Sequence, residues 1–334
     1  MKVDPNTMKG RWVLGIDIGG TSLVVAAVPV AGGKPNAIRS ESTYPERGPE
    51  DAVKRIASMA EDVIEQTLKA EGGCRKEFVG VGIGCPGPLD LDQGLIFTTP
   101  NLGWDGFPIR SRISSELKLP ASLDNDANCA TFGEWWLGAA QGVESLVGVT
   151  LGTGIGGGYI ERGRLMRGAS GSAFELGHTT INFEGRTCAC GNRGCLEAYA
   201  SGPNIASRAR DALTVGAKSV LSAMVEGDLN RITAETVYDA LLDGDALSAR
   251  LIQETAELLG IGLANVVNLF NPEMIVLVGG VSRAAEYLLD PLRESLSNRA
   301  FSSAVDACKI VPGSLPTTAG VIGAAGVFVS DEVA

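Results

Sequence analysis

The chain repeats one short glycine pattern, and this pattern constrains its fold more than any other feature. Residues 15–22 read GIDIGGTS and residues 148–155 read GVTLGTGI. Both stretches run Gly, apolar, polar, apolar, Gly, small, small, and both continue into a second apolar run. Each predicts a β-hairpin with a glycine turn, the first over 11–30, and the recurrence indicates two structurally similar halves. Chance recurrence in a chain with 44 glycines is the alternative.

The rest of the chain alternates between strand-like and helix-like patterns. Apolar residues at helical spacing predict a helix over 50–70, and a buried strand is expected over 78–87. The second half is mostly helical, with a long apolar helix over 247–270 and a strand over 273–282. A helix of small residues is expected over 317–329 and is able to pack closely on another element. Strands that alternate with helices indicate an α/β architecture.

Composition and charge disfavour several classes of protein. The 334 residues exceed a typical single core, so two domains are expected. The net charge of −11 argues against a nucleic-acid surface and against a basic membrane-binding face. No apolar run is long enough to cross a membrane, and the first residues lack the apolar core of a signal peptide. A reducing compartment is therefore expected.

The glycine turns are candidate phosphate loops, because backbone amides there can point at an anion without interference from a Cβ atom. The first turn adds Asp17, which could hold Mg²⁺, and Thr21, whose hydroxyl could donate to a phosphate oxygen. The second turn offers a cradle at 152–154, but it continues into Tyr159 rather than a helix, which disfavours a Rossmann fold. Tight turns without a ligand are the alternative for either loop alone. Two loops in matching positions, together with VGGV at 278–281, favour a nucleotide.

The segment LDNDAN at 123–128 places four polar side chains in one turn before a helix. Capping of the helix by Asp or Asn is the simpler interpretation. Since a cap needs only one such residue, the surplus suggests that some of these side chains face a ligand. A carboxylate here could accept a hydroxyl proton during phosphoryl transfer, and Asp126 is the candidate general base.

Three of the seven cysteines lie in CACGNRGC at 188–195, and the single histidine lies ten residues upstream. A disulfide is disfavoured by the expected compartment, and an iron–sulfur cluster usually needs a fourth cysteine. Tetrahedral zinc is favoured, although the C-x-C step is tighter than usual. Such a closed site is structural, and it would fix a loop that carries Glu175 and Glu197, two carboxylates suited to sugar hydroxyls. The expected zinc ligands are His178, Cys188, Cys190 and Cys195.

Taken in order, the motifs DIGGT, CPGP, DNDAN, GTGIGGG, ELGH and CACGNRGCLEAYASG resemble those of the ROK family (repressor, ORF, kinase) of sugar kinases. That family lies within the actin, hexokinase and Hsp70 ATPase superfamily. The resemblance implies an α/β, actin-like (ribonuclease H-like) fold of two domains, with ATP in the interdomain cleft and a structural zinc loop. We expect an N-terminal domain over 1–122 and a larger C-terminal domain over 123–317 with the zinc loop and a dimer surface. A final helix over 318–334 is expected to pack back on the first domain.

The resemblance also implies a role for each matched residue. Asp126 corresponds to the catalytic base on the sugar hydroxyl, and His178 would bind zinc through one ring nitrogen and face the sugar with the other. The expected sugar ligands are Gly87, Asn101, Asn125, Asp126, Glu175, His178 and Glu197. The expected nucleotide-binding residues are Asp17, Gly19, Gly20, Thr21, Gly152, Thr153, Gly154, Gly279 and Gly280.

The implied function is ATP-dependent phosphorylation of the 6-hydroxyl of glucose, with ATP, Mg²⁺ and structural Zn²⁺. The segments TPNLGW and CGNRGCLEAYASG resemble glucokinases, while CLEAYASG also resembles N-acetylmannosamine and N-acetylglucosamine kinases. Fructose ranks lower as a substrate, and polyphosphate is an alternative phosphoryl donor. We expect a cytoplasmic homodimer that binds neither nucleic acid nor membrane.

Three other functions compete with a sugar kinase. Sugar-sensing regulators of this family carry a winged-helix domain before the core, and only sixteen residues precede Asp17 here. A chaperone or filament ATPase would not explain a zinc loop flanked by glutamates. A zinc hydrolase needs an open coordination position, which four protein ligands would fill.

Overall fold

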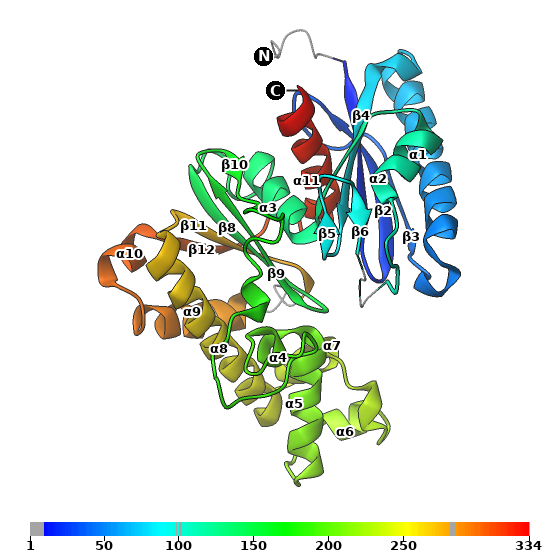
Figure 1. Cartoon of the computed structure of the whole chain (residues 1–334). Helices are drawn as coiled ribbons and strands as arrows, with labels where there is room; N and C mark the ends of the chain where they lie inside the picture. The colour runs from blue at the N-terminus through cyan, green and yellow to red at the C-terminus, as the bar shows by residue number, and fades with distance from the viewer. Residues whose placement is uncertain (1–9, 98, 100–101, 281–284, 334) are drawn as a thin grey trace. The chain divides into compact units, whose positions relative to one another are not determined.

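The computed structural model describes residues 10–97, 99, 102–280 and 285–333 of the chain (Figure 1). Internal contacts divide the chain into two compact units. The first unit is formed by residues 1–144, 158–174 and 317–334, and the second by residues 145–157 and 175–316.

The first unit contains a five-stranded sheet with the order β3-β2-β1-β4-β7. β1 (Trp12–Ile18) pairs antiparallel with β2 (Ser22–Pro29), which confirms the predicted hairpin. On its other side β1 pairs in parallel with β4 (Phe78–Cys85), and β4 pairs in parallel with β7 (Ala121–Asn125). β3 (Ile38–Ser42) pairs antiparallel with β2 at the edge of the sheet.

A second sheet has the order β10-β9-β8-β11-β12. β8 (Ser145–Leu151) and β9 (Ile155–Glu161) enclose the second glycine turn. β8 pairs in parallel with β11 (Met274–Val278), and β11 pairs in parallel with β12 (Lys309–Pro312), while the short β10 (Arg164–Leu165) pairs antiparallel with β9. In each sheet the strands lie in the same order of succession, third, second, first, fourth and fifth. The repeated sequence pattern therefore reflects a repeated strand topology, as predicted.

Helices cover both sheets and form the remainder of the second unit (Figure 1). Those of the first unit are α1 (Pro49–Glu71), α2 (Ile109–Leu117), α3 (Asp126–Trp136) and α11 (Ala319–Phe328), with a short ribbon of β5 (Leu89–Asp90) and β6 (Leu95–Ile96) and a final π-turn, η7 (Val329–Val333). Those of the second unit are η4 (Leu176–His178), α4 (Glu197–Ala200), α5 (Gly202–Thr214), α6 (Leu221–Met224), α7 (Ala234–Leu242), α8 (Ala246–Phe270), α9 (Ala285–Ser297) and α10 (Ser302–Ala307).

Alternation along β1 and β4 explains many glycines of the first unit. Leu14, Ile16 and Ile83 belong to the buried core that also contains the apolar faces of α1 and α2. The intervening positions point to the opposite face, where α11 packs on β1 and β4. A Cβ at Gly82 would collide with the backbone carbonyl of Ala324 in α11. These glycines are therefore required by a close helix rather than by a ligand.

The small residues of α11 also allow it to pack tightly against α3. A Cβ at Gly323 would collide with the carbonyl oxygen of Cys129, and a Cβ at Gly133 would collide with that of Ala319. This arrangement confirms the predicted close packing of the small-residue helix. In the second unit, the predicted long apolar helix is α8, which packs on α9 and buries Leu259.

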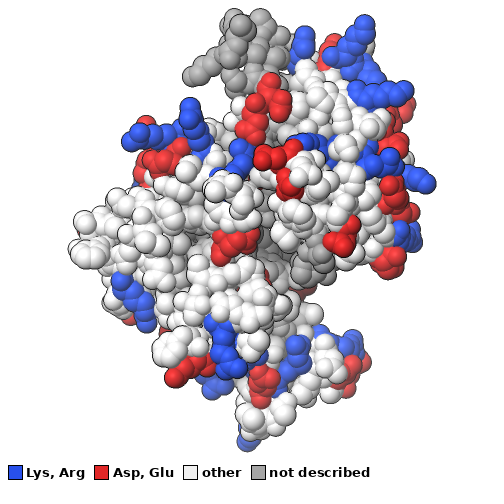
Figure 2. Space-filling model, in the orientation of Figure 1, with Lys and Arg blue, Asp and Glu red and all other residues white. Residues whose placement is uncertain are grey.

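Two surface properties bear on partners. No helix within the described ranges is long and apolar enough to cross a membrane. On the face drawn in Figure 2, acidic and basic side chains are interspersed and form no broad basic area among the described residues. This distribution agrees with the expectation, drawn from the acidic net charge, that nucleic acid is not a partner.

Candidate active site

The acidic side chains of the first unit gather at the carboxyl ends of its parallel strands. In the register of the sheet, Asp17 on β1 lies opposite Gly84 on β4, and Gly84 lies opposite Asp124 on β7. β7 ends at Asn125, and α3 begins at Asp126. Open α/β sheets bind ligands at the carboxyl ends of their strands, so this edge is a candidate for chemistry.

The carboxyl group of Asp17 has an altered affinity for protons. Burial and the negative charge of Asp126 raise the pKa of Asp17 to about 7. Burial, with smaller contributions from the same two carboxylates, raises the pKa of the Cys85 thiol well above its usual value. The carboxyl group of Asp17 lies against Gly320, at the start of α11, where a Cβ would collide with it. This edge of the sheet thus concentrates negative charge that a cation would neutralise.

The first glycine turn is held by hydrogen bonds within its own unit. The Gly19 amide donates to the Ser22 carbonyl at 2.8 Å, and the Thr43 hydroxyl donates to the Gly19 carbonyl at 2.6 Å. The Thr43 amide donates to the Thr21 carbonyl at 3.0 Å. Thr43 is fully buried, whereas Thr21 is exposed. Because the turn itself uses the Gly19 amide, a contact with phosphate would fall to Gly20 and Thr21.

The polar side chains before α3 have different partners. Asn125 caps the helix, since its side-chain oxygen accepts from the amides of Ala127 at 2.9 Å and Asn128 at 3.3 Å. The fully buried Asp124 accepts from Asn128 Nδ2 at 2.8 Å. It also forms an ion pair with Arg167 Nε at 2.6 Å. These contacts give three of the four polar residues a structural role, and no sequence pattern pointed to Arg167.

Asp126 is the fourth polar residue, and it lies half-buried in the first turn of α3. One of its carboxylate oxygens accepts from the amide of Ala127 at 2.8 Å. The N-terminus of a helix stabilises a negative charge, which favours the ionised form that a general base needs. Its charge also acts on Asp17, so the two carboxylates belong to one electrostatic group.

Of the other sugar ligands predicted in this unit, Gly87 lies beside Asn125. A Cβ at Gly87 would be 3.6 Å from Asn125 Nδ2. Asn125 therefore caps α3 with its oxygen while its amide group points toward Gly87. Asn101 lies outside the described residues.

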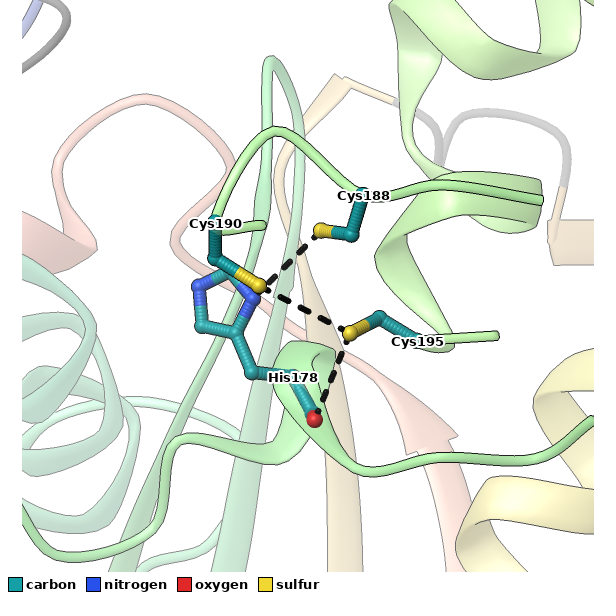
Figure 3. Close-up of side chains that lie close together, drawn as sticks. All are labelled: His178, Cys188, Cys190 and Cys195. Carbon is teal, nitrogen blue, oxygen red and sulfur yellow. Dashed lines mark hydrogen bonds between the residues drawn. The ribbon is translucent and has the colours of Figure 1, made fainter. Parts of the chain in front are cut away.

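The second unit brings the single histidine and three cysteines together (Figure 3). One ligand atom from each of His178, Cys188, Cys190 and Cys195 lies within 4.8 Å of the others. His178 Nδ1 is 3.7 Å from Cys188 Sγ, and Cys190 Sγ is 3.8 Å from Cys195 Sγ. η4 supplies the histidine, and the loop before α4 supplies the three thiols.

These separations fit tetrahedral zinc. Thiolates bound at about 2.3 Å in a tetrahedral site lie about 3.8 Å apart, which matches the Cys190 to Cys195 separation. His178 turns Nδ1 toward the thiols, so its Nε2 faces away from the cluster. Four protein ligands complete the coordination of zinc, as in structural sites.

Glu197, the first residue of α4, connects this cluster to the second glycine turn. Its Oε2 accepts from the Ile155 amide at 2.9 Å, and its Oε1 is 3.8 Å from Cys188 Sγ. From the other side, Gly177 packs on the carbonyl of Ile155, where a Cβ would collide. Glu175 precedes η4, and its carbonyl accepts from the amide of His178 at 3.1 Å. The predicted sugar ligands of this unit thus lie around the zinc cluster.

A cavity of about 720 Å³ lies next to the second glycine turn. Gly152 and Thr153 line one part of it, and Gly280, which follows β11, lines another. Gly279 has a φ of +103°, and a Cβ there would meet the Leu151 carbonyl, so this turn requires glycine. The structure therefore places both glycine segments predicted for the nucleotide on or beside one cavity.

The remaining walls of this cavity come from α5, α7 and α8, and they were not predicted from the sequence. Ile205 and Ile252 supply apolar surface, while Arg210 and Tyr238 supply polar groups, a combination typical of small-molecule sites. A helix-start signal was present, because α5 carries proline in its first turn. The periodic pattern of these helices gives no indication of which side faces a ligand.

Comparison with known proteins resolves the family. The family model described as the ROK family matches residues 13–330. The chain belongs to the ROK family. This confirms the resemblance found in the motifs, from the first glycine turn to the zinc loop and beyond.

Relatives within the ROK family include enzymes and regulators. A glucokinase of Halalkalibacterium halodurans is 36% identical over 317 residues, which cover 95% of this chain and 94% of the relative. A xylose repressor of Caldicellulosiruptor bescii is 36% identical over 278 residues, which cover 83% of this chain and 69% of the repressor.

A solved ROK structure matches the fold over nearly the whole chain. It is a ROK family glucokinase from Streptomyces griseus in complex with glucose and AMPPNP. The TM-score is 0.80 at 31% identity, and the match covers 95% of this chain and 98% of that chain. The predicted fold class, the α/β actin-like ATPase fold of ROK kinases, is therefore confirmed.

Proposed function

We propose that this ROK protein is an ATP-dependent glucokinase, which transfers the γ-phosphoryl group of ATP to the 6-hydroxyl of glucose. Similarity to glucokinases over nearly its whole length supports the activity. The structural observation that carries the proposal is the position of Asp126. It lies at the N-terminus of α3, beside Asp17, at the carboxyl ends of three parallel strands.

Asp126 is the proposed general base. Its carboxylate accepts the proton of the sugar 6-hydroxyl as that oxygen bonds to the γ-phosphorus. The bond from the γ-phosphorus to the bridging oxygen breaks at the same time, and ADP leaves with the electron pair. The cap on Asn125 and the ion pair of Asp124 hold the start of α3, so that the base is positioned before the substrate arrives.

The cavity beside the second glycine turn is the proposed adenosine site. Apolar walls suit the base, and Gly152, Thr153 and Gly154 place backbone amides at the end of β8, where phosphates would lie. Gly279 and Gly280 are assigned to the adenosine side. The first turn, with Gly19, Gly20 and Thr21, is assigned to the phosphates, with the Gly19 amide satisfied inside the turn.

Asp17 is the proposed magnesium ligand. The fit is chemical, because a partly buried carboxylate beside a second negative charge gains from a divalent cation, and magnesium prefers oxygen ligands. When bound, the ion would neutralise charge that develops on the phosphates. The contribution of the chain is to hold Asp17 against α11 at the end of β1.

The zinc cluster is proposed to be structural and to organise sugar recognition. Zinc held by His178 and the three cysteines would fix η4 and the start of α4. The proposed sugar ligands are Gly87, Asn101, Asn125, Asp126, Glu175, His178 and Glu197. A homodimer and a cytoplasmic location are further parts of the proposal, supported by the family resemblance, and equilibrium sedimentation tests the dimer.

The activity is tested by ADP release with ATP, Mg²⁺ and single sugars. Glucose, mannose, fructose, N-acetylglucosamine and N-acetylmannosamine are compared at matched concentrations, and the highest kcat/KM is expected with glucose. Polyphosphate in place of ATP, with glucose 6-phosphate as the measured product, tests the phosphoryl donor.

The Asp126→Asn variant, assayed in parallel, shows that ADP release comes from this site. A higher kcat/KM with an N-acetylhexosamine would replace glucose as the substrate and leave the kinase class intact. Sugar binding by calorimetry without ADP release from any sugar would instead contradict the kinase and indicate a sugar-sensing regulator.

A further inference from the structure

The carboxylate of Glu197 contacts the second glycine turn directly. Its Oε2 accepts from the Ile155 amide at 2.9 Å, and a Cβ at Gly154 would lie 2.6 Å from the same oxygen. The carboxylate therefore fills the space left open by the missing side chain of Gly154. A carboxylate that accepts from a backbone amide forms a charge-assisted hydrogen bond, which is stronger than a neutral one.

The segment that follows Glu197 holds the other end of the same turn. The Gly202 amide donates to the Gly152 carbonyl at 2.8 Å. Asn204 Nδ2 donates to the Glu197 carbonyl at 2.9 Å and to Ser201 Oγ at 2.8 Å, which ties this segment together. Both ends of the turn are thus bonded to one short stretch of chain, from α4 to the start of α5.

The proposed zinc ligands lie next to these contacts. Cys195 is two residues before Glu197, and His178 follows Gly177, whose α-carbon packs on the Ile155 carbonyl. The amide and the carbonyl of Ile155 are therefore contacted by residues within two positions of a proposed zinc ligand. A metal that fixes the cluster would fix both contacts as well.

We infer that Glu197 is a positioning residue for the phosphate loop of the nucleotide site, and that it couples the cysteine–histidine cluster to ATP binding. The inference rests on the proposed function, which assigns residues 152–154 to the phosphates. It adds to the sugar contact expected of Glu197 from family resemblance. A residue that only contacts sugar would have no effect on nucleotide binding in the absence of sugar.

Titration calorimetry with AMPPNP and Mg²⁺, without sugar, separates these roles. Replacement of Glu197 by alanine removes the acceptor from the Ile155 amide, and we expect AMPPNP to bind about 5- to 20-fold more weakly. Replacement by glutamine keeps a side-chain oxygen for this amide, so affinity is expected within about twofold of the wild type. Glu184→Ala is the matched control, because Glu184 is an exposed carboxylate of the same loop region, and it should bind AMPPNP like the wild type.

Zinc content and thermal melting of each variant exclude loss of the metal or of the fold as the cause. Where Glu197→Ala does not fold with its metal, Glu197→Asp carries the test. Its carboxylate is one methylene short of the Ile155 amide, so weaker AMPPNP binding is again expected.

Two negative results have different meanings. Wild-type protein that fails to bind AMPPNP contradicts the proposed function itself. Wild-type protein that binds AMPPNP, with Glu197→Ala and Glu197→Asp binding equally well, overturns the positioning role and leaves the kinase proposal standing.

Discussion

Arg167 and Asp124 form an ion pair at 2.6 Å in which the carboxylate of Asp124 is completely buried. The second guanidinium arm of Arg167 bonds to Asp331 at 2.6 Å, in the final turn of the chain. Asp124 is the penultimate residue of β7, immediately before the cap of α3. One side chain thus links the end of the chain to the segment that carries the proposed base.

Removal of this arginine should be strongly destabilising. Arg167→Ala leaves the buried carboxylate of Asp124 without its charge partner, and breaking a buried pair typically costs about 3–5 kcal/mol. We expect a lower melting temperature by differential scanning calorimetry and a reduced kcat, because the start of α3 loses its support.

The control for this variant is Arg162→Ala. Arg162 is 83% exposed and lies 3.7 Å from Glu161, an ion pair of the kind that contributes little to stability. Equal melting temperatures for the two variants would mean that the buried pair does not stabilise the fold.

Asp126→Asn should separate binding from catalysis. Asparagine has nearly the same shape but cannot accept the hydroxyl proton, so kcat should fall by about 10²–10⁴-fold. Glucose and AMPPNP affinities, measured by calorimetry, should stay within a few fold of the wild type. A kcat near the wild-type value would remove Asp126 from the role of base.

Asp17 should make the stability of the protein depend on pH. Its folded pKa of about 7 exceeds its ordinary value of 3.8, so the folded state binds more protons than the unfolded state between these values. Stability from this group is fully present below about pH 4 and is lost as the pH rises to about 7. At roughly 1.4 kcal/mol per pKa unit, the loss amounts to a few kcal/mol.

The matched variant is Asp17→Asn, which does not titrate. The difference in unfolding free energy, variant minus wild type, should grow between pH 4 and pH 7 and stay constant above. Urea denaturation at several pH values, without added divalent cation, measures it. A pH-independent change in stability from lost contacts shifts this curve but not its slope, so a flat difference would refute the raised pKa.

Zinc analysis tests the cysteine–histidine cluster. Protein purified without chelator should contain about one zinc per chain, as expected for a closed site with four protein ligands. Cys190→Ser should lower the zinc content and the melting temperature, because zinc binding contributes to folding energy. Cys74→Ser, which changes an exposed thiol outside the cluster, should alter neither. Full zinc content in Cys190→Ser would exclude this cysteine as a ligand.

Gly323→Ala gives a test in which the sign of the effect decides. Helix propensity alone predicts that alanine stabilises α11 by about 1 kcal/mol. A Cβ at this position would instead collide with the carbonyl of Cys129 in α3, and such overpacking typically costs about 1–3 kcal/mol. We expect a lower melting temperature, whereas a higher one would show that α11 has room to move.

Much of the site was predictable because its parts are local in sequence. The spacing of the cysteines, the sole histidine and the two glycine turns each lie within a few residues or repeat a recognisable pattern. The hairpins and the long helices followed from periodicity, which depends only on neighbouring residues. For the same reason, the position of the glycine turns between first and second strands of matching sheets followed from the repeat.

Other parts depended on contacts between distant segments. The turn before α3 has four polar residues, and the sequence did not distinguish the cap, the buried ion pair and the candidate base. That division required Arg167, which is 43 positions away. The walls of the cavity from α5 and α7 could not be predicted either, because amphipathic helices show which side is apolar and not what that side covers.

The sequence by itself determined the strand order within each repeat, the residues able to hold zinc and the family of the protein, because each of these depends on short, local patterns. Only the tertiary structure decided that the alternate glycines of β4 serve α11, that Arg167 neutralises Asp124, and that Glu197 reaches the Ile155 amide. The physical reason is that packing and hydrogen bonds join atoms that are near in space, and the fold alone brings residues 42 positions apart, such as Ile155 and Glu197, to a separation of 2.9 Å.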